Sequence, residues 1–193
     1  SPCVVLGAAL SVTGGPGRVT AARVTSHVNA SVVVASGGGA TTTGGIVARV
    51  GSADAHIRVA AVSLTAYRSR VEALGTGAVA GAVAALGVAI ACPRGEIVLV
   101  VGNASTFTAW QESSIRVSSL SSDTGVVLAG VAVAVQTMQG SQLWLNGLVL
   151  AAAHGTTVDC RGELGGSYRC LAAVGVALLA NARGNVLHAS DNT

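Results

Sequence analysis

The eight acidic residues are the side chains of this chain that could cleave a polysaccharide, because such sites commonly use a pair of carboxylates. They are spread along the sequence, and none stands within two residues of another. A pair could form only between neighbouring turns of a repetitive fold, where Glu96, Glu112 and Asp123 are the candidates. A polysaccharide lyase or hydrolase is therefore the alternative to a non-catalytic protein.

Metal and nucleotide chemistry has no matching motif in the sequence. Metal ligands stand at close spacing, but the four histidines are far apart and the four cysteines form no Cys-x-x-Cys. The glycine-rich stretches 14–17 and 37–39 lack the Lys-Ser or Lys-Thr of a phosphate loop, so we expect turns there. The sequence predicts no catalytic residue, no cofactor and no metal.

Two tryptophans are candidates for binding, because an exposed indole offers a large face for stacking on a sugar or on a partner protein. They are Trp110 and Trp144. Trp144 stands between Leu143 and Leu145, so in a strand it points to the face opposite both leucines. Burial at a strand edge is the alternative for each indole.

The four cysteines are compatible with disulfides in an oxidising compartment. We expect Cys160 and Cys170 to pair, since they enclose a glycine-rich loop that could bring two strand ends together; buried thiols are the alternative. Asn29 and Asn103 are each followed by Ala-Ser, and both are glycosylation acceptors if the chain is exported.

The composition favours a regular stack of small side chains. Hydrophobic residues make up 51% of the 193 residues, yet aromatic residues make up only 3% and charged residues 10%. A chain without large aromatic side chains must bury many small ones, as repeat proteins do. The net charge is +3 and the arginines are scattered, so the sequence predicts no nucleic-acid partner.

Alternation of apolar and polar residues predicts many short strands, separated by Gly, Ser, Thr and Asn. Apolar residues recur at positions i, i+2, i+5 and i+7 in Ile57–Leu64 and in Leu143–Leu150, and partly from Val19 and Ile115. The step from i+2 to i+5 shifts the alternation by one residue, which indicates a bulge or a corner. We expect one turn of a solenoid to take about 20 to 30 residues.

These repeats predict an all-β fold, a parallel β-helix in which residues 1–193 form a single solenoid segment. An antiparallel β-sandwich is the alternative, because it also has many short strands between turns. Arg58, Arg116 and Trp144 share the position between the first two apolar residues of the repeat. In stacked coils, we expect these three side chains to line one outward face.

The segment Ala73–Cys92 contains a single polar residue, Thr76, and is long enough to cross a bilayer as a helix. Its glycines weaken a helix, and no aromatic residues flank it. We therefore expect a pair of buried strands, and a membrane protein with a span at 73–92 is the alternative.

The runs Asn29–Gly39, Ser113–Ser122 and Val126–Val135 resemble the dispersed gene family surface proteins of trypanosomes and their kinetoplastid relatives. The resemblance is one of repeat style and covers most of the chain. It implies a β-helical fragment of a larger ectodomain, extracellular or at the cell surface, with membrane association through regions outside this chain. The leading hypothesis is a non-catalytic cell-surface or secreted repeat protein that binds a protein or a glycan in adhesion.

Overall fold

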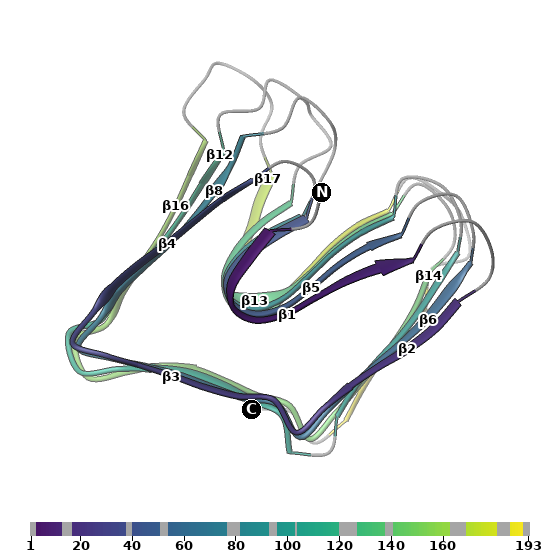
Figure 1. The fold of residues 1–193 in the computed structure, drawn as a ribbon, viewed down its shortest axis with the longest axis horizontal. Helices are drawn as coiled ribbons and strands as arrows, with labels where there is room; N and C mark the ends of the chain where they lie inside the picture. The colour runs from purple at the N-terminus through teal and green to yellow at the C-terminus, as the bar shows by residue number, and fades with distance from the viewer. Residues whose placement is uncertain are drawn as a thin grey trace.

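Every element of the computed structural model is a β-strand (Figure 1). The structure describes residues 3–12, 17–37, 40–50, 54–76, 82–92, 96–102, 104–119, 127–137, 141–162, 169–180 and 186–190. Every pairing between described strands is parallel. The predicted all-β fold and its parallel β-helix are confirmed, and the antiparallel sandwich is wrong.

The strands form four sheets, named A to D, in which hydrogen-bonded neighbours come from successive coils. Sheet A contains β1 (Cys3–Val12), β5 (Ala40–Val50), β9 (Ala82–Cys92), β13 (Val127–Thr137) and β17 (Arg169–Ala180). Sheet B contains β2 (Gly17–Ala22), β6 (Ala55–Ala60), β10 (Ile97–Gly102), β14 (Ser141–Asn146) and β18 (Val186–Ser190). Sheet C contains β3 (Thr25–Asn29), β7 (Ser63–Tyr67), β11 (Thr106–Trp110) and β15 (Val149–Ala152). Sheet D contains β4 (Val32–Gly37), β8 (Arg70–Gly75), β12 (Ser114–Ser119) and β16 (Thr157–Gly162).

One coil consists of four strands, which follow one another through sheets B, C, D and A. We number the coils from 1 (β2–β5) to 4 (β14–β17); β1 precedes coil 1 and β18 follows coil 4. Aligned residues of successive coils are 38 to 45 positions apart, as from Val19 to Ile57 and from Val88 to Val133. The predicted coil of about 20 to 30 residues is therefore too short. The repeat in the sequence covers only sheets B and C, which are half of a coil.

Corners between sheets B and C explain the shift in the apolar repeat. Ala61 in coil 2 and Gly147 in coil 4 have φ angles of 52° and 62°, in the left-handed region. A single residue in this conformation turns the strand direction and moves the next inward position by one place. Val62 and Leu148, directly after these residues, are both buried.

The core is a stack of inward rows, each with one side chain per coil. Leu64 and Phe107 lie at the same register position in sheet C, and both are completely buried. Val71 and Ile115 form the corresponding row in sheet D. Small and β-branched side chains fill most other inward positions, in agreement with the composition.

Sheet A bends sharply near the middle of its strands (Figure 1). Gly45 and Gly87 lie in one row at this bend, each with a φ of 144°. All of β9 is buried on both faces, which accounts for the nearly unbroken apolar run in its sequence. The segment 73–92 thus contributes the end of β8 and the whole of β9, and residues 77–81 between them lie outside the described part. Among the described residues, no helix has the length and apolar character needed to cross a membrane.

Candidate binding face on sheet B

The three residues predicted to share one face lie on two sheets. Arg58 and Trp144 occupy one register row of sheet B, with Val100 between them. Arg116 lies on sheet D, in the middle of β12. The prediction of a single face is therefore wrong for Arg116, because the apolar spacing around it belongs to a strand of sheet D.

The outward side of sheet B, which we call the sheet B face, joins positive charge to aromatic and apolar surface. Strand alternation sends every second residue outward, as the alternating burial of β6 and β14 shows. None of the outward residues in the described strands is acidic. They are Arg18, Thr20, Ala22, His56, Arg58, Ala60, Val98, Val100, Gln142, Trp144, Asn146, Val186, His188 and Ser190.

Coils 1 and 2 supply the cationic part of this face. Arg18 and His56 are register neighbours, and Arg58 lies two residues further along β6. All three side chains are exposed, and neither arginine has an ion-pair partner within the described residues. Together with Thr20 and Val100 they border a shallow depression of about 300 Å³.

The other end of the sheet B face is aromatic. Trp144 and His188 are register neighbours on β14 and β18, and their rings stack with a centroid distance of 3.8 Å and an interplanar angle of 14°. Trp144 remains 43% exposed. Asn146 and Ser190 help to line a depression of about 560 Å³ beside the two rings. The indole is therefore partly open to solvent while its stack on the imidazole orients it.

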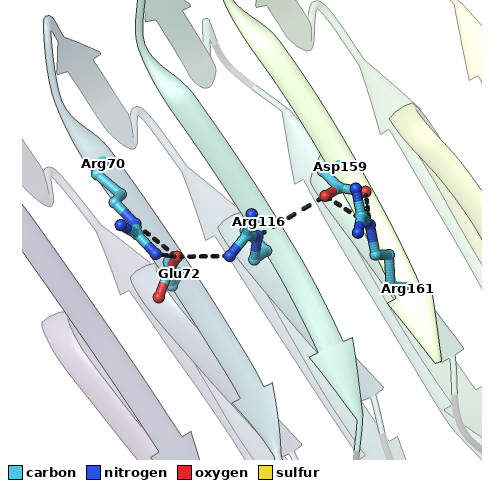
Figure 2. A network of polar contacts seen from close by, with 5 residues as sticks. All are labelled: Arg70, Glu72, Arg116, Asp159 and Arg161. Atoms are coloured by element: carbon cyan, nitrogen blue, oxygen red, sulfur yellow. Dashed lines mark hydrogen bonds and ion pairs between the residues drawn. The ribbon is translucent and has the colours of Figure 1, made fainter. Parts of the chain in front are cut away.

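Arginines of sheet D have carboxylate partners within the protein, in contrast to those of sheet B. Figure 2 shows Arg116 between the carboxylates of Glu72 and Asp159, at nitrogen–oxygen distances of 3.6 and 3.7 Å. Arg70 binds Glu72 at 2.6 Å, and Arg161 binds Asp159 at 2.8 Å. These five residues, the sheet D ladder, link coils 2, 3 and 4. Arg116 thus connects coils and is not part of the sheet B face.

A second aromatic row lies at the edge of sheet C, next to its corner with sheet D. Trp110 stacks on His154 with ring centroids 5.2 Å apart, and Tyr67 donates its hydroxyl hydrogen to Gln111 at 2.7 Å. Arg68 lies 5.4 Å over the ring of Tyr67. The sequence identified Trp110, but it contained no local signal for its partners in the neighbouring coils.

The two Asn-Ala-Ser triplets are corner sequences in this fold. Ser31 donates its hydroxyl hydrogen to the carbonyl oxygen of Asn29 at 2.7 Å, and Ala30 between them has a φ of 46°. Ser105 is buried and accepts the backbone N–H of Val62 at 3.3 Å. The Asn29 side chain is exposed, whereas Asn103 lies outside the described residues. Glycosylation at both asparagines stays a prediction.

The predicted disulfide concerns side chains that the structure does not describe. The backbones of Cys160 and Cys170 lie in β16 on sheet D and in β17 on sheet A. Residues 163–168 between them are outside the described part. The pairing therefore stays a prediction, and Cys92 is completely buried in β9.

The two candidate catalytic carboxylates within the described residues, Glu96 and Glu112, lie at different corners of the coil. Glu96 precedes β10 in sheet B, Glu112 lies at the corner between sheets C and D, and Asp123 is outside the described residues. Asp54 instead neighbours Glu96, whose backbone N–H it binds through Oδ1 at 3.0 Å. In the described part of the chain, no three His, Cys, Asp or Glu residues gather closely enough to hold a metal ion.

No family model, curated protein or solved structure matches this chain. The fold and the chemistry of the individual faces are therefore the basis on which function is proposed.

Proposed function

We propose that this protein is a non-catalytic, cell-surface or secreted repeat protein that acts in adhesion through the sheet B face. The observation that carries the proposal is the contrast between two sheets. On sheet D the arginines are engaged by Glu72 and Asp159. On sheet B, Arg18 and Arg58 have no ion-pair partner among the described residues, and the acids nearest in sequence, Asp54 and Glu96, stand before the strands begin. Arginines without an ion-pair partner, on the same sheet face as an exposed indole, are suited to recognition.

The scaffold supports this role because it holds the binding groups in place before a ligand arrives. Arg58, Val100 and Trp144 lie on consecutive strands joined by parallel backbone pairing. The strands, and not flexible loops, carry these side chains, so little conformational entropy is lost when a ligand is bound.

The proposal includes an extracellular location and a larger parent protein, both of which are expectations from the sequence. The chain is a segment of a larger extracellular or cell-surface ectodomain, similar in style to the trypanosome surface proteins. Any attachment to a membrane is through regions outside this chain. A disulfide between Cys160 and Cys170 and glycans at Asn29 and Asn103 are compatible with export.

Adhesion of protein-coated beads to cultured cells or to extracellular matrix tests the proposal. The test variant is Arg58→Gln/Trp144→Ala, and the matched control is Arg68→Gln/Trp110→Ala, which removes the same residue types from the corner of sheets C and D. We expect the test variant to abolish most adhesion and the control to retain it. Beads of the native chain that do not adhere, or equal losses in both variants, would overturn the proposal.

A polysaccharide lyase or hydrolase is the second candidate, and one observation favours it. Asp54 and Glu96 bring two carboxylate-bearing residues together on adjacent coils at the beginning of sheet B. The assay measures the release of new chain ends from acidic polysaccharides. The double variant Asp54→Asn/Glu96→Gln removes both carboxylates and should be inactive. Cleavage that this double variant abolishes would establish the enzyme and refute the non-catalytic proposal.

A further inference from the structure

We propose that the ligand of the sheet B face is an acidic polysaccharide, a linear glycan that carries carboxylate or sulfate groups and lies across the strands. This inference rests on the proposed function and specifies the ligand class of the same face. It follows from the charge, the aromatic stack and the repeat geometry of sheet B.

The arginines on the face, which have no ion-pair partner among the described residues, favour an anionic ligand. Arg18 and Arg58 are permanently positive, and a planar guanidinium binds a carboxylate or a sulfate through two parallel hydrogen bonds. His56, next to Arg18 in register, adds a further donor. Asp54 and Glu96 are exposed just before β6 and β10, at the edge of the sheet where these strands begin. These acids direct a polyanion away from that edge and across the middle of the sheet.

The aromatic end of the face distinguishes a sugar from a simple anion. The ring faces of sugars carry C–H groups that pack on an indole, and Trp144 is 43% exposed and oriented by its stack on His188. Gln142 and Asn146, the outward neighbours of Trp144 on β14, supply amide groups for hydroxyl groups of the ligand. Cations at one end and an indole with amides at the other match a sugar chain with acidic substituents.

The spacing of the face suits an extended polymer. The row Thr20, Arg58, Val100, Trp144 and His188 crosses five adjacent strands. Neighbouring strands are about 4.8 Å apart, so four steps between strands extend over about 19 Å. Val98 and Val100 form a low apolar surface between the charged and aromatic ends. A linear chain of sugars could contact both ends of this row at once.

Binding of three purified polymers to the 193-residue chain tests the inference, with far-ultraviolet circular dichroism to verify folding of every variant. Heparin supplies sulfates, polygalacturonate supplies carboxylates, and dextran is the neutral control. We expect both acidic polymers to bind and dextran not to bind. Arg18→Gln/Arg58→Gln should weaken binding about tenfold to a hundredfold, and Trp144→Ala about tenfold, since charge-assisted contacts and stacking contribute separately.

The matched control is Arg68→Gln/Arg161→Gln, which removes the same charge from other sides of the coil and should leave affinity within about twofold. Equal weakening by the control would show that net charge alone attracts the polymers and would overturn the inference. Duplex DNA binding as tightly as heparin, or no binding of either acidic glycan, would also overturn it. Bead adhesion without glycan binding would refute the ligand class and retain the proposed function, whereas beads that fail to adhere would refute the function.

Discussion

Replacing Gly87 by alanine would place a methyl group where the backbone of the next coil already lies. A Cβ on Gly87 would stand 1.9 Å from the carbonyl oxygen of Ala132, and the residue has a φ of 144°. Gly44 offers a matched control, because its Cβ would stand 3.0 Å from Leu86 Cδ1, the end of a side chain that can turn aside. Both substitutions add one methyl group to sheet A, but only one of them meets a fixed backbone atom.

The expected cost of Gly87→Ala has two parts. A non-glycine residue in this backbone region costs about 1–3 kcal/mol. Displacing the packed backbone of β13 costs about another 1–3 kcal/mol, so the free energy of unfolding should fall by about 2–6 kcal/mol. Gly44→Ala should change it by less than about 1 kcal/mol, because the alanine also restricts the unfolded chain.

Urea unfolding followed by tryptophan fluorescence measures this difference, since Trp110 lies in coil 3, next to the substituted coil, and Trp144 lies one coil further on. With a denaturant dependence of about 2 kcal/mol per molar urea, Gly87→Ala should lower the midpoint by about 1–3 M. Equal midpoints for the Gly87 and Gly44 variants would refute the close approach of β9 and β13 at this row.

Three further substitutions test the core, a corner and the sheet D ladder. Phe107→Ala should cost about 3–5 kcal/mol in urea unfolding, because this ring is fully buried; a cost under about 1 kcal/mol would contradict its central position. Ser113→Ala should lower the free energy of unfolding by about 1–3 kcal/mol, because its buried hydroxyl accepts the Ser69 N–H and donates to the Trp110 carbonyl. An unchanged free energy of unfolding would contradict these hydrogen bonds at the corner. Arg116→Met should lower the free energy of unfolding by less than about 1 kcal/mol, as measured by thermal unfolding, because Arg116 and its partners are partly exposed to solvent. This difference should disappear in molar salt. A difference that salt does not change would argue against an ionic ladder.

The inward and outward faces of the strands were predictable because alternation is a property of a single strand. The position of Trp144 between Leu143 and Leu145 was sufficient to turn it outward, and the structure leaves it 43% exposed. The break in the repeat likewise indicated a corner, which Gly147 forms. The apolar segment Ala73–Cys92 predicted a pair of buried strands; β9 is buried throughout, whereas the end of β8 alternates and leaves Leu74 partly exposed.

The length of a coil was not predictable from the same pattern. Leu99 is aligned with Ile57 and Leu143, the first apolar residues of the two clear repeats. The connection from β10 to β11 is one residue longer than the connection from β6 to β7. Phe107, which is aligned with Leu64, therefore stands at i+8 from Leu99 and not at i+7. An added residue in a solvent-exposed corner costs little free energy and leaves no periodic signal. The apolar spacing that begins at Ile115 resembled the repeat by chance, because this strand lies in sheet D and not in sheet B.

The sequence by itself determined the all-β class, the inward and outward alternation of the strands and the outward position of Trp144. Only the tertiary structure decided that Arg116 lies between Glu72 and Asp159 and that Trp144 stacks on His188. The physical reason is how far apart along the sequence the interacting residues stand. Alternation arises between residues two positions apart, whereas neighbours across coils are 38 to 45 positions apart and depend on the length of every corner and loop between them.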